Sequence, residues 1–203
     1  MLKAIRGWLR NTPEVNTRPA FGDFLTEQAF FASQKSVVSY CEVKAGVNRD
    51  KLFAEQEFQE ALTRCRWESF AAVLADLTLL SYRFLRDHAA GREADLAAAL
   101  VRLYAALLDA QARPSHRPEG WEDVVLPLAA RLEQARVEGV ASPSEVARTA
   151  ARRVMQVLPI HEEHRRQDRE AIEGAVRFHT VAVWEAMGRR VDAPAVAAAL
   201  LKT

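Results

Sequence analysis

The sequence lacks most of the features that identify an enzyme or a secreted protein. Its 203 residues include two cysteines, Cys41 and Cys65, which are too few for a disulfide framework and suit a reducing compartment. The glycines lie singly, so there is no glycine-rich phosphate loop, and no Gly-x-Ser-x-Gly elbow or Cys-x-x-Cys pair occurs. We therefore expect no cofactor, and the balance favours a protein that is not an enzyme.

An excess of one charge and a long apolar run are missing as well. The chain has 28 Lys and Arg against 27 Asp and Glu, a net charge of +1, so no strong field attracts nucleic acid. No apolar run is long enough for a membrane span, and the N-terminus does not resemble a secretory signal. These absences predict a cytoplasmic protein. Arginine outnumbers lysine 23 to 5, a bias typical of GC-rich bacterial genomes.

Strand patterns are also absent, and helical patterns take their place. No run of alternating β-branched residues is bounded by turn residues. Residues 47–90 contain neither glycine nor proline, and within them residues 70–80 are apolar on every helical face except at Asp76 and Thr78. A soluble helix that is apolar all round is surrounded by other helices. The sequence therefore predicts an all-α, single-domain bundle of six to eight helices around a long central helix at about residues 50–90.

Capping residues predict where other helices begin and end. Asp23 is an acceptable N-cap for a helix that ends at Gly46. Ser142, Pro143 and Glu145 have the spacing of a helix start with a capping box. The expected parts of the chain are an amphipathic arm with a linker, the bundle domain, and a short C-terminal helix or tail, at residues 1–20, 21–190 and 191–203.

Asp76 is the acid that this pattern places deepest in the bundle. An unpaired carboxylate is costly to bury among apolar residues. Asp76 is therefore expected to lie at the rim, to pair with an arginine of a neighbouring helix, or to bond a helix N-terminus. Such structural pairs are the more common reason for a buried acid. The alternative is a ligand-binding role for Asp76, in a bundle that binds a small apolar ligand.

His161 and His164 form the most metal-like pair in the sequence, because side chains three residues apart are neighbours on a helix. Their spacing is not that of the zincin His-Glu-x-x-His motif, and the chain contains no Glu-x-x-His of the di-iron bundles. Residues 161–170 contain no apolar side chain, which favours a solvated helix face over a metal site.

The first ten residues have an apolar face and a basic face. The apolar side chains are Leu2, Ile5, Trp8 and Leu9, and the basic ones are Lys3, Arg6 and Arg10. This composition is typical of a helix that lies on an anionic membrane surface. The same face could instead dock onto the bundle or onto a partner. Three cations without a wider basic surface are too few to indicate nucleic acid.

Phe30 and Phe31 point about 100° apart on a helix, so one of them is expected at the edge of the core. An exposed phenylalanine beside an apolar arm would serve as a contact for a partner or for a second copy of the chain. The sequence therefore favours an interaction protein, such as an adaptor, assembly factor or regulatory factor. It would bind a protein partner or form a homodimer.

Overall fold

The computed structural model describes residues 14–202, and the regular secondary structure in this part of the chain is helical apart from one isolated parallel bridge between Val15 and Val191. The α-helices are α1 (Arg18–Ala45), α2 (Arg49–Ala54), α3 (Gln56–Leu85), α4 (Glu93–Asp109), α5 (Glu122–Glu138), α6 (Pro143–Val146), α7 (Arg148–Val157), α8 (Glu162–Gln167), α9 (Arg169–Arg190) and α10 (Ala193–Leu201). Because α6 adjoins α7 and α8 adjoins α9, the described chain forms eight helices when each pair is taken as one bent helix. The predicted all-α bundle is confirmed.

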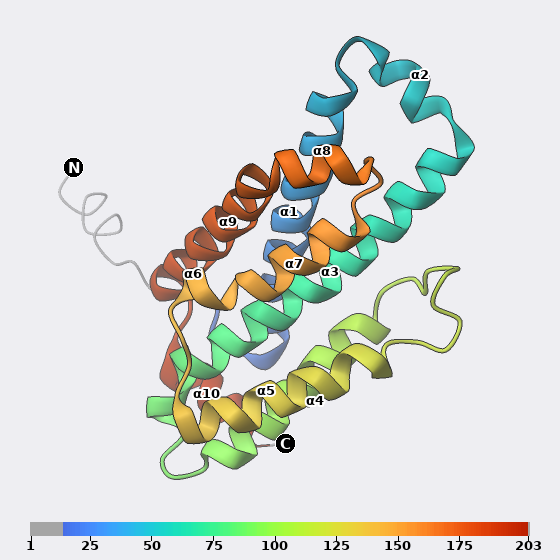
Figure 1. Ribbon diagram of the computed structural model, residues 1–203. Helices are drawn as coiled ribbons and strands as arrows, with labels where there is room; N and C mark the ends of the chain where they lie inside the picture. The colour runs from blue at the N-terminus through green and yellow to red at the C-terminus, as the bar shows by residue number, and fades with distance from the viewer. Residues whose placement is uncertain (1–13, 203) are drawn as a thin grey trace, which may run out of the picture.

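Helix α3 is the centre of the bundle. Figure 1 shows α4 and α5 side by side along one flank of α3, while α1, α7 and α9 cover its other side. The fully buried side chains of α3 include Phe70, Leu74, Leu77 and Leu80. A helix packed on several sides must be apolar on several faces, which explains the composition of residues 70–80.

The expected long helix at residues 50–90 is interrupted near its polar end. Glu55 adopts an extended conformation between α2 and α3. The Nε2 of Gln59 donates to the Phe53 carbonyl at 2.7 Å, and the rings of Phe53 and Phe58 pack 5.1 Å apart. A side-chain donor thus satisfies a carbonyl at the helix end. Figure 1 shows this corner projecting beyond the rest of the bundle.

Helix α1 begins five residues before the expected cap at Asp23. The hydroxyl of Thr17 accepts from the Ala20 amide at 3.3 Å, and Pro19 lies in the first turn, where its missing amide hydrogen costs nothing. Asp23 therefore lies inside the helix. The other predicted start is correct, because Ser142 and Glu145 form a complete capping box.

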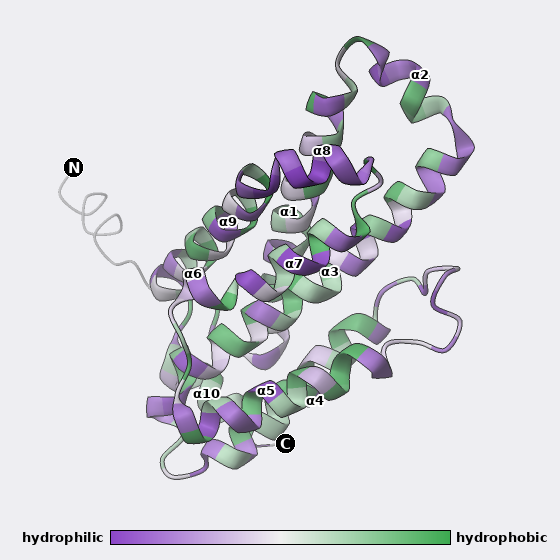
Figure 2. Ribbon diagram, viewed as in Figure 1, coloured by the Kyte–Doolittle hydropathy of each residue, from purple (hydrophilic) through white to green (hydrophobic). Residues whose placement is uncertain are grey.

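The C-terminal segment is part of the bundle. Asp192 caps α10 by accepting from the Ala195 amide at 3.1 Å, and Val196 and Leu200 are buried. Helix α10 packs against α3 and α4. Figure 2 shows that α8, in contrast, is hydrophilic along its whole length. Within residues 14–202, no helix combines the length and apolarity needed to cross a bilayer.

Candidate functional site

A cleft of about 180 Å³ lies between α3, α5 and α7, and we call it the α3–α5–α7 cleft. Its floor on α3 is formed by Ala72 and Ala75, two small side chains between the acids Glu68 and Asp76. Positions separated by three or four residues share one helix face. The cleft therefore exists because α3 places small residues on the face that carries its two buried acids.

Glu68 lies at one end of the cleft and is 3% exposed. Arg117, from the loop between α4 and α5, donates from Nε to Oε1 at 2.6 Å and from Nη2 to Oε2 at 2.8 Å. Arg153 of α7 donates to Oε2 at 2.5 Å, and His116 Nε2 lies 3.0 Å from Oε1. Two guanidinium groups and an imidazole thus surround one buried carboxylate.

The Glu68 carboxylate is held in its ionised form. Burial acts to raise its pKa, but hydrogen bonds and charge from Arg117 and Arg153 outweigh burial and lower the pKa to about 2. Arg117 also pairs with Asp123 and stacks over the Trp121 ring at 4.6 Å. Glu68 therefore fixes the loop between α4 and α5 to α3 and α7 by charge.

Asp76 lies two turns further along α3 and is fully buried. Its Oδ1 accepts from Arg131 Nη2 of α5 at 2.7 Å, and its Oδ2 accepts from the Ala150 amide at 2.9 Å. Ala150 is the third residue of α7, so Asp76 satisfies one of the free amides at the N-terminus of that helix. Both structural partners expected for Asp76, an arginine and a helix N-terminus, are present together.

The environment of Asp76 shifts its pKa in the opposite direction from that of Glu68. Burial raises the pKa to about 6, and the charge of Arg131 and the bond from the Ala150 amide offset this only in part. Asp76 itself lies behind Arg131, which lines the cleft. The two acids of α3 thus hold one arginine each at the cleft, Arg153 through Glu68 and Arg131 through Asp76.

The two cysteines lie in the core. Cys41 and Cys65 are fully buried, and burial raises the pKa of each thiol to about 12. A thiol with such a pKa carries almost no thiolate at neutral pH, and the thiolate is the nucleophile. Both positions fit small core residues.

His161 and His164 lie on the solvated helix α8. Their ring centroids are 6.3 Å apart, and His161 Nδ1 accepts from the Glu163 amide at the start of the helix. Across residues 14–202, no three or more His, Cys, Asp or Glu side chains are placed to share a metal ion. Among the described residues, the two imidazoles therefore have no additional side chains with which to bind a metal ion.

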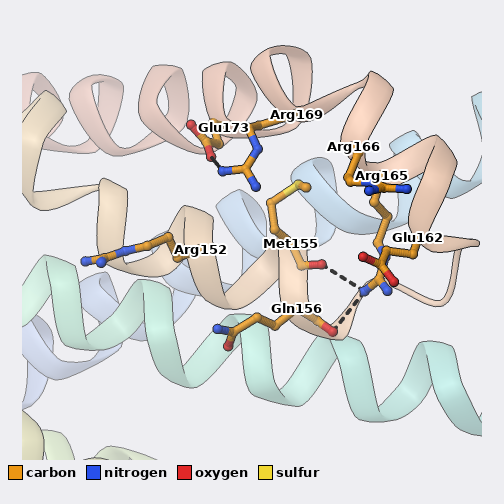
Figure 3. A pocket seen from close by; sticks show the side chains of 8 residues that line it. All are labelled: Arg152, Met155, Gln156, Glu162, Arg165, Arg166, Arg169 and Glu173. Atoms are coloured by element: carbon orange, nitrogen blue, oxygen red, sulfur yellow. Dashed lines mark hydrogen bonds and ion pairs between the residues drawn. The ribbon is translucent and has the colours of Figure 1, made fainter.

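A second hollow, of about 510 Å³, lies beside α8 between α7 and α9. Figure 3 shows that the Arg165 guanidinium points to the end of α7, where Nη1 donates to the carbonyls of Met155 and Gln156 at 2.9 and 3.0 Å. Arg169 pairs with Glu173 at 3.5 Å across one turn of α9. Arg165 thus caps a helix C-terminus, and this hollow is open and polar.

Phe30 and Phe31 have different environments, as the sequence predicted. Phe30 is half-buried and stacks on Phe70 with ring centroids 4.0 Å apart, and it meets Trp67 edge-on. Phe31 is 53% exposed. Phe30 is thus occupied within the molecule, and Phe31 presents its ring to solvent.

Phe31 belongs to an exposed apolar surface on the neighbouring helices α1 and α9. The His179 ring meets Phe31 edge-on at 5.7 Å and Phe178 at 5.4 Å, and Phe178 is 70% exposed. Burial lowers the pKa of His179, and the nearby Lys35 ammonium lowers it further. We call the surface formed by Phe31 and Lys35 of α1 and by Phe178 and His179 of α9 the α1–α9 face.

The arm residues that the sequence singled out lie outside the described residues; they are Leu2, Lys3, Ile5, Arg6, Trp8, Leu9 and Arg10. The chain that follows them is fixed to one end of α9. The Val15 amide donates to the Arg190 carbonyl at 3.0 Å, and the Asp192 amide donates to the Val15 carbonyl at 2.9 Å. Val15 thus holds the start of the described chain beside the C-terminal end of α9.

Glu68 is the residue that sequence reasoning missed. It lies eight residues before Asp76, a spacing that keeps two side chains on one broad helix face, so a second buried acid was readable in principle. Its partners were not readable, since Arg117 is 49 positions away in a loop.

Comparison with protein-family models, curated proteins and solved structures finds no match to this chain.

Proposed function

We propose that this chain is a non-enzymatic interaction protein that binds a helical segment of another protein through the α1–α9 face. The observation that supports this proposal is the exposure of Phe31 and Phe178 on neighbouring helices, joined by the ring of His179. Exposed aromatic rings that gather in one place are typical of interaction sites, whereas single exposed apolar residues are ordinary. Phenylalanine and other aromatic side chains are enriched at the centres of protein interfaces.

Charge favours a partner whose apolar residues are flanked by acids. Lys35 lies close enough to His179 to act on its pKa, so the face has a cationic border. In a symmetric dimer the same surface meets itself, and two Lys35 ammonium groups would then approach each other. A different protein with Asp or Glu beside its apolar side chains is thus the better match than a second copy.

Affinity capture with matched variants tests this function. The wild-type chain and the Phe31→Ser/Phe178→Ser variant would be used as baits in an extract of the native organism. A Leu126→Ser/Val137→Ser variant is the control, because it removes two equally exposed apolar side chains from α5. We expect a partner that the control retains and the face variant loses at least tenfold, with binding that weakens at high salt. Equal capture by all three baits would contradict the proposal, and a concentration-dependent dimer in light scattering would identify a homodimer instead.

We also propose that residues 1–10 make a second contact, with an anionic membrane surface. The support is the separation of apolar and cationic side chains in the sequence of this arm. Co-sedimentation with phosphatidylserine-containing vesicles would compare the full chain with one that lacks residues 1–10. We expect the full chain to bind these vesicles and not neutral ones. Equal sedimentation of the two chains would rule out a membrane role for the arm.

A further inference from the structure

We infer that the α3–α5–α7 cleft is a binding site for a small carboxylate with an apolar body, about the size of one aromatic ring. The site is formed by other residues than the α1–α9 face, and it does not depend on the function proposed for that face. Three features of the cleft support this site: its size, its apolar walls, and the exposure of the charged groups at its ends.

Size and wall chemistry limit the ligand to a small apolar group. The cleft has a volume of about 180 Å³, and a cavity of about 150 Å³ is enough to hold benzene. Its walls are formed by Ala72 and Ala75 of α3 and by Val124, Pro127 and Leu128 of α5. Apolar walls with a few charged groups at defined positions are typical of small-molecule sites.

The exposed charges that line the cleft are the guanidinium groups of Arg131 and Arg153 and the carboxylate of Asp123. The Arg131 and Arg153 side chains are 24% and 39% exposed, whereas their partners Asp76 and Glu68 are 0% and 3% exposed. Each carboxylate thus lies behind the guanidinium that it holds. A ligand that enters the cleft meets these two guanidinium groups, and it also meets the Asp123 carboxylate, which is 63% exposed and is paired with Arg117.

Both guanidinium groups retain donors for a ligand. Arg131 uses Nη2 for Asp76, and Arg153 uses Nη2 for Glu68 and Nη1, at 3.4 Å, for Gln156. A guanidinium carries five N–H donors, and its planar edge matches the two oxygens of a carboxylate. The pairs with the buried acids also fix the orientation of each arginine before a ligand arrives, which reduces the entropy cost of binding.

The test is a titration of the ¹⁵N-labelled full chain, followed by amide chemical shifts. Benzoate is the probe, and benzamide is its neutral counterpart of the same shape. Ala72→Leu fills the floor of the cleft, and Ala61→Leu makes the same change at an exposed position of α3 outside it. Arg153→Gln removes one of the two cations and leaves the pair of Asp76 with Arg131 in place.

We expect saturable shifts with benzoate at the residues that line the cleft, and at least tenfold weaker binding of benzamide. The affinity for benzoate should fall at least tenfold in Ala72→Leu and severalfold in Arg153→Gln, and stay unchanged in Ala61→Leu. Equal affinity for benzoate and benzamide would overturn the requirement for a carboxylate. Failure of benzoate to saturate the wild-type shifts would overturn the site, as would undiminished binding in Ala72→Leu. If Ala72→Leu does not fold, the affinity of Arg153→Gln for benzoate alone decides whether the cleft is the binding site.

Discussion

Glu68 and Asp76 lie on the same face of the same helix, both are buried, and both hold an arginine at the same cleft, yet their surroundings differ. Glu68 has two guanidinium groups and an imidazole around it, and its pKa is lowered to about 2. Asp76 has one guanidinium and one backbone amide, and its pKa is raised to about 6. The number of cations that reach a buried carboxylate therefore decides whether burial or charge controls it.

The difference also separates two roles. Glu68 joins three parts of the chain, α3, α7 and the loop before α5, through partners that keep some contact with solvent. Asp76 joins α3 to α5 and to the first turn of α7 through one guanidinium and one backbone amide. A carboxylate with three side-chain partners can lose one and keep two, whereas loss of Arg131 would leave Asp76 with a single amide donor. Asp76 should therefore be the more fragile of the two.

Removal of the single cation at Asp76 is expected to have the largest effect. Arg131→Met would leave a buried carboxylate with one amide donor, and breaking a buried ion pair in this way costs about 3–5 kcal/mol. The free energy of unfolding in urea measures the loss. Arg136→Met is the control, since Arg136 pairs with Glu133 on the exposed face of α5 and such pairs contribute about 0–1 kcal/mol. Similar losses in the two variants would mean that Asp76 does not depend on Arg131.

The pH dependence of stability should have opposite signs at the two acids. The folded-state pKa of Asp76 is raised above its ordinary 3.8, so the folded chain holds the proton more tightly, and the stabilisation present below pH 4 is lost as pH rises through 6. The folded-state pKa of Glu68 is lowered below its ordinary 4.5, so its stabilisation is present above pH 4.5 and is lost as pH falls towards 2.

Two isosteric variants separate these slopes. The free energy of unfolding of wild type relative to Asp76→Asn should decrease by about 2 kcal/mol from pH 4 to pH 7, because a shift of one pKa unit corresponds to about 1.4 kcal/mol and an unfolded aspartate is already partly ionised at pH 4. The free energy of unfolding of wild type relative to Glu68→Gln should decrease instead as pH falls from 4.5 to 2. Urea unfolding at a series of pH values measures both. Differences that do not vary with pH would show that the two environments do not differ as described.

How much of this site the sequence predicted depends on how far apart along the chain the interacting residues lie. The all-round apolar stretch of α3 and the cap at Ser142 are local patterns, so they were readable and are correct. The burial of Asp76 and the kind of partner it needs follow from the cost of an unpaired acid in an apolar helix. Arg131 is 55 positions away and Arg117 is 49 positions from Glu68, so tertiary packing alone selects them.

The start of α1 shows the same limit at short range. The sequence predicted the cap at Asp23, and Thr17, the cap in the structure, belongs to a residue type that caps helices less often than Asp. Phe21 and Phe24 are both buried, and a helix that starts at Arg18 presents both of them to the core. Packing therefore selects Thr17. The α1–α9 face was predicted only in its α1 half, as an exposed phenylalanine at position 30 or 31, because the neighbour that completes it, Phe178, lies far along the chain on α9.

The smallest expected effect resolves the two cations at Glu68. Arg117 donates two hydrogen bonds to this carboxylate and its side chain is 11% exposed, whereas Arg153 donates one and is more exposed. Arg117→Gln should therefore raise the pKa of Glu68 by about 1–2 units, and Arg153→Gln by less than 1, since a nearby opposite charge lowers a carboxyl pKa by about 1–3 units. A ¹³C titration of the Glu68 side chain measures both shifts, with Arg66→Gln on the exposed side of α3 as the control. Equal pKa shifts in the two variants would mean that only the number of cations, and not their hydrogen bonds or burial, sets the low pKa of Glu68. A larger shift in Arg153→Gln would reverse the ranking of the two arginines.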